Sequence, residues 1–308
     1  MVPLAAAIVT GVCGLIITSK NPQFFTASVV NVCSLLRYST VTLVHYLSYF
    51  LFLSNRTKVY ALLKGVIRFD RDYLSIPNAG HNIEKVMFIV ILALYNFRIY
   101  DAVIFFGSML IEFYFYIQNL FVLLFVELIM VRYRMLHRTT LKTRNRNVLL
   151  TLLKLHDHLG VMKELITKAF GAFCMITSVV VFVQSAIIAY CLLWMWQQKI
   201  STGLILMASI NLPFNVIFFF GWTYSFDLLE HEEQEFKNAI KSLQYRSTED
   251  QPASFSEFLD IIDLKLLTES PKITACGLFS INLTVFCNVF TAIVTYIMIL
   301  FQFKDLEK

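Results

Sequence analysis

A long uncharged stretch near the C-terminus carries polar side chains at a regular spacing. Residues 277–303 contain no charged residue, and about 27 residues at a rise of 1.5 Å each are enough for a helix to cross a bilayer. Steps of three, four and seven return to the same face of a helix, and Ile299 fills the gap in the series. The stripe comprises Thr284, Asn288, Thr291, Thr295, Ile299 and Gln302.

Hydroxyl and amide groups on a spanning helix support two alternative chemistries. They can hydrogen-bond to neighbouring helices inside a bundle. They can also line a water-filled pore enclosed by several copies of the helix. In that case the absence of charge on the stripe before Lys304 predicts a wide or weakly selective pore. The spacing alone leaves both alternatives open.

Other residue types with catalytic potential do not form a recognisable site. His156 and His158 are two residues apart, which places them on different faces of a helix, and no Cys or Glu follows at ligand spacing. The six cysteines lie in apolar stretches without metal or redox spacing. The sequence contains no phosphate loop, hydrolase nucleophile motif or dinucleotide fingerprint. We therefore expect no enzyme, no metal site and no cofactor, and no nucleic acid partner.

The composition predicts an all-α membrane protein with several spans. Hydrophobic residues make up 57% of the 308 residues and charged residues only 15%, a balance that soluble proteins of this size seldom reach. The apolar run 86–135 is too long for one crossing, so it predicts a hairpin that turns near Gly107 or earlier, at 96–101. Seven transmembrane helices in a single domain, 1–308, are expected at about 2–18, 28–53, 83–105, 108–133, 170–196, 203–229 and 277–303.

Lysine and arginine residues predict the orientation of these spans. The segments 54–85, 132–168 and 230–272 hold 20 of them, whereas the segments on the opposite side hold five. Because basic residues mark the cytoplasmic side, the N-terminus is expected inside and the C-terminus outside. This orientation is opposite to that of a G-protein-coupled receptor and argues against that class.

Amphipathic stretches predict a cytoplasmic helical layer at about 134–169 and 230–272. Leucines in 148–168 follow a helical period and run into the fifth span without a proline, which predicts one long helix. The sixth span is expected to continue into the acidic stretch after Leu229. A further helix is expected at 254–268, with Phe255, Phe258, Leu259 and Ile262 buried, before Pro271 breaks the chain.

Polar and aromatic side chains in the outer halves of the spans are candidates for binding a small molecule. Polar groups inside spans are costly and mark function more often than elsewhere, although Tyr and Trp also form interfacial belts. Span six offers Asn215 beside Asn211. Arg37 lies deep in span two and is expected to pair with Glu112. The candidate ligand-binding residues are Arg37, Tyr95, Glu112, Tyr116, Gln184, Tyr190, Trp194 and Asn211.

The end of the last span carries a motif. Thr295-Tyr296, five hydrophobic residues and Gln302-Phe303 resemble the signature in the last transmembrane segment of insect gustatory receptors, which are related to insect odorant receptors. Residues 155–159 and 277–282 are similar to two further stretches of that family. The resemblance covers about 110–308, and the first three spans by layout only.

The resemblance implies a function and an assembly. It implies a tastant-gated, nonselective cation channel subunit in the plasma membrane of sensory neurons, assembled as a homo- or hetero-tetramer with other gustatory receptors through the cytoplasmic layer. It implies a closed gate near the outer end of the pore, where Gln302 and Phe303 match the motif, and an apolar ring such as Ile299 or Phe303 can gate there by excluding water. Sugar-sensing members often carry an acid after the Thr-Tyr pair, where this chain has Ile297, so bitter compounds are expected rather than sugars. The alternatives are a membrane transporter and a non-conducting partner subunit of a chemoreceptor complex.

Overall fold

The protein is described by a computed structural model over residues 40, 43–44, 46–48, 50–73, 107–143, 145–197, 202–247, 253–268 and 271–306. Six helices and one two-stranded hairpin have defined bounds in these ranges. They are α3 (Arg56–Tyr73), α5 (Gly107–Lys142), α6 (Arg146–Gln197), α7 (Thr202–Ser247), α8 (Ala253–Thr268), β1 (Thr274–Ala275), β2 (Phe279–Ser280) and α9 (Leu283–Leu306).

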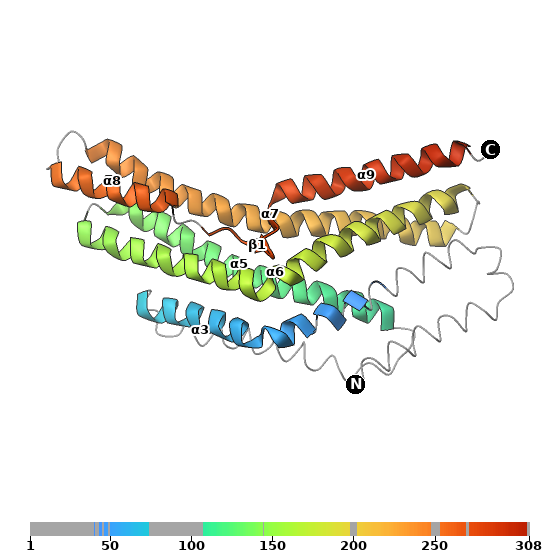
Figure 1. Ribbon diagram of the computed structural model, residues 1–308, viewed down its shortest axis with the longest axis horizontal. Helices are drawn as coiled ribbons and strands as arrows, with labels where there is room; N and C mark the ends of the chain where they lie inside the picture. Colours follow the sequence, from blue (N-terminus) through green and yellow to red (C-terminus); the bar gives the residue numbers. More distant parts are fainter. Residues whose placement is uncertain are drawn as a thin grey trace.

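Three long helices run side by side along the bundle (Figure 1). α5, α6 and α7 contain 36, 52 and 46 residues. At 1.5 Å per residue even α5 reaches about 54 Å, well beyond a hydrocarbon core of about 30 Å. The predicted continuity of 148–168 with span five, and of span six with the acidic stretch, is confirmed by α6 and α7. α5 begins at Gly107, one of the two positions expected for the turn of the 86–135 hairpin.

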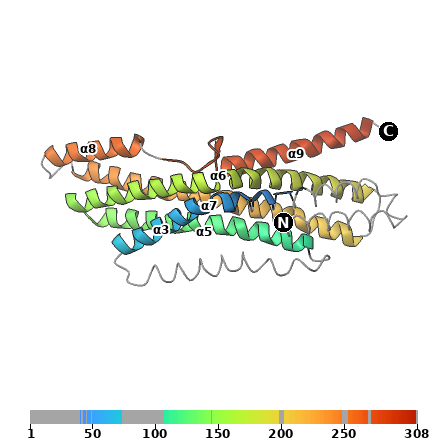
Figure 2. The ribbon, with the colours of Figure 1, turned by 60° about the horizontal axis from the view of Figure 1, so that its bottom comes forward.

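α8 and α9 lie at opposite ends of the bundle, and the C-terminus lies at the α9 end (Figures 1 and 2). The helix predicted at 254–268 is confirmed by α8. The connector after it contains the antiparallel pair β1–β2, in which Thr274 faces Ser280 and Ala275 faces Phe279. The prediction that the last helix begins at about 277 is wrong, because α9 begins at Leu283. Cys276 and Gly277 have positive φ angles of 54° and 77°, which a right-handed helix does not accept.

An aromatic core holds the long helices together. Phe121 and Phe125 on α5 pack against Phe170 on α6, with ring centroids 6.2 and 5.8 Å apart. On α7, Trp222 is fully buried and stacks on Phe219 at 5.9 Å. Large rings bury much apolar area at little entropic cost, so this core fixes the relative positions of the helices.

α3 is an amphipathic helix that the charge of its segment alone did not predict. Its buried residues Val59, Leu62, Val66 and Phe69 recur at steps of three and four and pack toward α5 and α6. α3 lies close to α6 at Gly65, where an added Cβ would make an ordinary van der Waals contact of 3.6 Å with Cε of Met162. The basic segment after span two is therefore part of the bundle.

By length and composition, two helices of the described residues could cross a membrane, Phe115–Lys142 and Arg146–Leu193, and Leu283–Ile299 is a shorter apolar helix. The spans expected at 2–18 and 83–105, and much of 28–53, lie outside the described residues. The expected number of seven spans therefore stays a prediction.

Candidate functional site

The polar stripe of α9 faces away from its own subunit. Thr284, Asn288, Thr291, Thr295, Ile299 and Gln302 are all exposed. The opposite face packs on α7, where the ring of Phe286 lies 6.1 Å from Phe219 and 5.3 Å from Phe220. Ile293 is buried on this packed face. Among the described residues, none buries the side chains of the stripe, and their hydroxyl and amide groups can meet water or another subunit.

The base of α9 is fixed to α6 through the hairpin. The Thr274 N–H donates to Oγ1 of Thr167 on α6 at 3.4 Å. Gly171 lies one turn further along α6, and a Cβ there would meet Thr274 O and Cys276 N at only 3.0 Å. Asn282 then caps α9, because its Oδ1 accepts from the Val285 N–H at 3.3 Å. The connector that leads into α9 therefore packs directly against α6 at Thr167 and Gly171.

Tyr116 is the candidate ligand-binding residue with the most specific surroundings. Its hydroxyl donates to Oδ1 of Asn215 on α7 at 2.7 Å. Its ring packs edge to face against Phe214 and Phe218, with centroids 5.3 and 4.7 Å away. Asn215 is 4% exposed. The result is a polar pair flanked by aromatic rings between α5 and α7, with Phe214 itself 51% exposed; aromatic and polar groups of this kind are typical of small-molecule sites.

Three of the other candidate ligand-binding residues have side chains that the structure describes, and four do not. Gln184 is buried on α6, Tyr190 is half-buried near its end, and Asn211 is half-buried one turn before Asn215. The side chains of Glu112, Trp194 and Phe303, and the whole of Arg37 and Tyr95, lie outside the described residues. The expected Arg37–Glu112 pair therefore stays a prediction.

A small cavity lies between α5, α6 and the helical segment that precedes α3. Ser48, Gln118, Phe121, Phe170 and Phe173 are among its lining residues, and its volume is about 10 Å³. Ser48 Oγ and Gln118 Oε1 are buried without a hydrogen-bond partner. A site of this size holds about one water molecule, so it is too small for an organic ligand.

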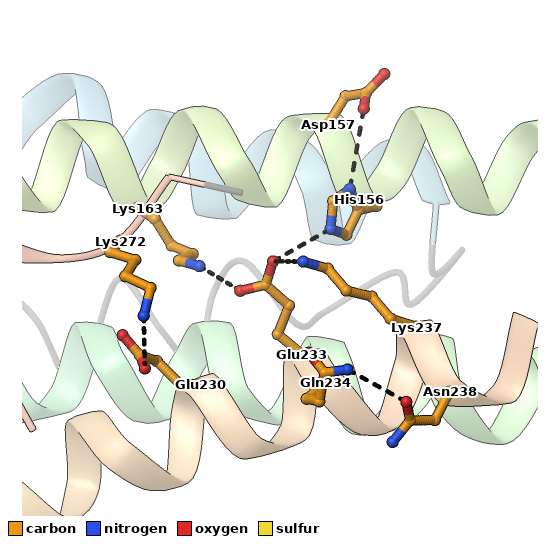
Figure 3. Close-up of polar contacts among 9 residues, drawn as sticks. All are labelled: His156, Asp157, Lys163, Glu230, Glu233, Gln234, Lys237, Asn238 and Lys272. Atoms are coloured by element: carbon orange, nitrogen blue, oxygen red, sulfur yellow. Dashed lines mark hydrogen bonds and ion pairs between the residues drawn. The ribbon is translucent and has the colours of Figure 1, made fainter. Parts of the chain in front are cut away.

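Glu233 is the centre of a buried ionic cluster where α6 meets α7 (Figure 3). Its carboxylate is ion-paired with Lys163. Lys237 Nζ and His156 Nε2 lie 3.3 and 3.4 Å from its Oε1. Lys163 and Glu233 are 1% and 4% exposed. A lone buried carboxylate would cost several kcal/mol, so the ammonium groups of Lys163 and Lys237 are what make its burial possible.

Further ion pairs join the rest of this layer. Lys265 on α8 lies 2.7 Å from Asp157 on α6, and Lys272 in the connector lies 3.7 Å from Glu230 on α7. Arg134 Nε on α5 donates to Glu232 Oε1 at 2.6 Å, and this hydrogen bond raises the pKa of the Arg134 guanidinium above its ordinary value. α5, α6, α7, α8 and the connector to α9 are thus linked by charge.

α3 is joined to the same layer by a buried pair. Nη2 of Arg132 on α5 lies 2.5 Å from both carboxylate oxygens of Asp70, and both side chains are 4% exposed. The Arg132 guanidinium also lies 5.5 Å from the centre of the Phe69 ring. In the part of the chain that the structure describes, no group of three or more His, Cys, Asp or Glu residues is placed to hold a metal ion.

These helices, with the exposed polar stripe at one end and the charged layer at the other, can be compared with known proteins. The family model of the 7tm chemosensory receptors matches residues 4–307. The chain belongs to this family. Members of this family are membrane receptors and not enzymes, so family membership supports a non-enzymatic membrane protein. Comparison with curated proteins gives no match.

The fold of the receptor is similar to that of a solved structure. The insect olfactory receptor OR5 from Machilis hrabei superposes with a TM-score of 0.61 at 11% sequence identity. The alignment covers 98% of the receptor and 88% of the olfactory receptor. At this identity the likeness concerns the fold, and it confirms the all-α architecture of an insect chemosensory receptor.

The sequence did not show the partners of two buried polar residues, Asn215 and Glu233. Asn215 stood among the polar residues of span six, but Asn211 was favoured over it, although the i to i+4 spacing puts both on one helix face. Glu233 carried no signal beyond its acidic stretch, because its partner Lys163 is 70 residues away. His156, which was excluded as a metal ligand by its spacing in the sequence, lies beside Glu233 in this ionic cluster.

Proposed function

We propose that the receptor is a subunit of a gustatory, tastant-gated, nonselective cation channel whose pore is lined by α9. The observation that carries the proposal is the exposure of all six stripe positions, Thr284 to Gln302, on a helix whose apolar Phe286 and Ile293 pack against its own subunit. Thr295, Tyr296, Gln302 and Phe303 lie on this same helix and supply the gustatory signature. Apolar residues of α9 such as Phe290, Val294 and Met298 are exposed as well, so the subunit leaves both a polar strip and an apolar strip of this helix uncovered, and the polar strip is the one suited to water.

A pore needs several copies of α9, and we propose a homo- or hetero-tetramer with other gustatory receptors. The subunits sit in the plasma membrane of sensory neurons with the N-terminus inside and the C-terminus outside, as the distribution of basic residues favours. The ionic layer around Glu233 then lies in the cytoplasm, and α9 runs outward from its base at the hairpin. The ends of the four helices meet near the outer surface.

The gate lies at this outer end, at Ile299, Gln302 and Phe303. Ile299 interrupts a stripe that is otherwise hydroxyl and amide, and an apolar ring in a narrow pore excludes water and ions. Opening requires the helices to move apart. A ligand supplies this free energy only to the extent that it binds the open state more tightly than the closed state.

The ligand site proposed for this coupling is the region around Tyr116, with Asn211 and Asn215 on α7. The rings of Phe214 and Phe218 and the Tyr116–Asn215 hydrogen bond favour an apolar ligand with one or two polar groups. Ile297, at the position where sugar receptors often carry an acid, favours bitter compounds over sugars. α7 carries this site on one face and Phe219 and Phe220 against α9 on another, so it connects ligand to pore.

The proposal is tested by cysteine accessibility along α9. Single cysteines at Thr284, Thr291 and Gln302 should react with a charged, water-soluble thiol reagent, and the reaction should change the whole-cell current. Cysteines at Phe286 and Ile293 are the matched controls on the packed face and should leave the current unchanged. The background for these variants replaces the exposed Cys287 and Cys276 with serine.

Sidedness makes the test sharper. With reagent outside, Gln302→Cys should react in the closed state, whereas Thr284→Cys should react only when ligand opens the channel, because a dry constriction at Ile299 blocks a charged reagent. Equal reactivity around the helix would remove α9 from the pore and return its hydroxyl groups to helix packing. Binding of ligand with no current in any partner combination would favour a non-conducting subunit.

A further inference from the structure

One exposed face changes from apolar to basic along the described helical residues 43–44, 46–48 and 50–53 and then α3. Leu43, Leu47, Phe50 and Leu53 are exposed at steps of four and three. The same spacing continues with Arg56, Tyr60, Lys64 and Arg68, which are also exposed. Backbone hydrogen bonds from Asn55 N to Leu51 O and from Val59 N to Asn55 O carry the helical path across the junction. The face therefore runs from apolar, through one aromatic ring, to basic.

The basic part of this face contains three cations before its first acid. Asp70 is buried and pairs with Arg132, and Asp72 follows Arg68 by four residues at the end of α3. Lys58 is held to the bundle, because its Nζ donates to Asn55 Oδ1 and to the backbone oxygen of Lys168. The nearby Lys168 is neutralised by Glu164 at 2.5 Å. What remains on the face is an exposed stripe of three cations, Arg56, Lys64 and Arg68, with one acid, Asp72, at its end.

The position of the stripe relative to the bilayer follows from the apolar residues before it. Four exposed apolar side chains in succession need hydrocarbon, and Tyr60, with 69% of its surface exposed, suits the membrane–water interface. α7 shows a similar change, since its exposed apolar face ends at Tyr224 and Asp227 follows. Lys64 and Arg68 lie about 6 and 12 Å beyond Tyr60 along the helix. Those distances are comparable to a headgroup layer and to the Debye length in physiological salt.

We propose that the basic face of α3, formed by Arg56, Tyr60, Lys64 and Arg68, binds the headgroup of an anionic phospholipid in the cytoplasmic leaflet. Charge complementarity selects an anion, and continuity with the exposed apolar face selects one that carries acyl chains. An acidic protein could use only the basic half of the face. The choice of leaflet rests on the proposed orientation of the receptor, in which 54–85 is cytoplasmic.

Through α3 such a lipid would reach the layer that supports the channel. The buried pair Asp70–Arg132 connects α3 to α5, and Lys58 connects α3 to the backbone of α6. A headgroup that holds α3 at the membrane therefore also holds the α5–α6 part of the bundle. The lipid is a fixed anchor for helices that gating must move.

The test uses the full-length receptor purified in an uncharged detergent, with fluorescent short-chain phosphatidylserine and phosphatidylcholine as probes. The variant R56Q/K64Q/R68Q removes three charges from the face. The control R138Q/K142Q/K154Q removes three charges from exposed positions on α5 and α6 around the turn that joins them. Near a membrane surface each Lys or Arg contributes about 1 kcal/mol. The first variant should thus weaken phosphatidylserine binding on the order of a hundredfold at low salt, and the control should bind like the wild type.

Three results would overturn the inference. The first is equal affinity of the wild type for the two probes. The second is an equal loss in both triple variants, which would show an effect of net charge alone. The third is competition by glycerophosphoserine as strongly as by the lipid, which would identify a site for a soluble anion. Because the measurement is made in detergent, it reports headgroup binding whichever way the chain inserts, and it does not depend on α9 lining a pore.

Discussion

Arg132 is a buried cation, and the loss of its partner Asp70 should lower the free energy of unfolding by a predictable amount. Its guanidinium is 4% exposed and relies on the Asp70 carboxylate and the Leu128 carbonyl. Arginine keeps its charge at any physiological pH. Without Asp70 the charge could neither neutralise itself nor reach water.

Asp70→Asn should therefore destabilise the receptor by about 3–5 kcal/mol, because it leaves the Arg132 charge buried without a counter-ion. Thermal unfolding of the purified protein in detergent measures this. The double variant Asp70→Leu/Arg132→Met should recover most of the loss. Glu164→Gln is the control, since its pair with Lys168 is solvent-exposed and such pairs are worth about 1 kcal/mol or less. A D70N protein as stable as the wild type would show that the pair does not hold α3 in place.

Tyr116 gives the second prediction at this scale. Tyr116→Phe keeps the ring packing but leaves the buried Asn215 Oδ1 without its donor, which costs about 1–3 kcal/mol. If a ligand binds here, the half-maximal concentration for activation by a bitter compound should change about tenfold while surface expression persists. Concentration–response recordings measure the change. Tyr224→Phe, an exposed tyrosine of α7, should leave the response as it is, and equal responses of both variants would place the ligand elsewhere.

Among the elements, the long helices could be predicted from the sequence and the connections could not. α6 and α8 follow from apolar spacing without an interrupting proline, and the exposed stripe of α9 follows from the spacing of its Thr and Asn residues. The hairpin of β1 and β2 has two residues per strand, too few to show an alternating period. Its turn depends on Cys276 at positive φ, which propensities do not favour.

The partners within the site were hidden for a different reason. Tyr116 and Asn215 are 99 residues apart, and Asp70 and Arg132 are 62 apart. Periodicity predicts which face of a helix is buried, but it does not predict which helix packs against it. Residues could therefore be proposed as candidates one by one, whereas their pairing required the structure.

The close packing of the hairpin on α6 gives a prediction for Gly171. Gly171→Ala should move the hairpin, because the new Cβ would lie 3.0 Å from backbone atoms of Thr274 and Cys276. We expect a lower midpoint of thermal unfolding and, in recordings, an altered current without ligand, since the base of α9 shifts. Gly221→Ala on α7 is the matched control, because a Cβ there meets nothing within 4 Å. It should be neutral or gain up to about 1 kcal/mol of helix propensity. A G171A protein that matches G221A would mean that the hairpin does not bear on α6.

At the scale of the whole molecule, orientation decides which end of the bundle meets the cell interior. An epitope placed after Lys308 should be stained on intact cells, because α9 leads outward from the cytoplasmic layer in the proposed topology. An epitope in the turn between α5 and α6, at residues 143–145, should be stained only after permeabilisation. The reverse pattern would place the ionic layer around Glu233 outside and would contradict the proposed gate at the outer end of the pore.

Assembly is the last property of the whole molecule that the single chain indicates. α8 buries Ile262 and Leu266 against its own subunit, whereas Ile261 and Leu264 are 63% and 65% exposed. Apolar side chains on an extramembranous helix at the far end from α9 have no lipid to cover them, so we expect them to meet a neighbouring subunit. The variant I261D/L264D should then reduce the assembly from the proposed tetramer to a smaller species on size-exclusion chromatography with light scattering, while its helical circular dichroism persists. I262D should instead lower the stability of the subunit itself, because a carboxylate at this position would be buried without a partner. An unchanged mass for I261D/L264D would exclude this face of α8 from the interface and leave the contacts between α9 helices to hold the subunits together.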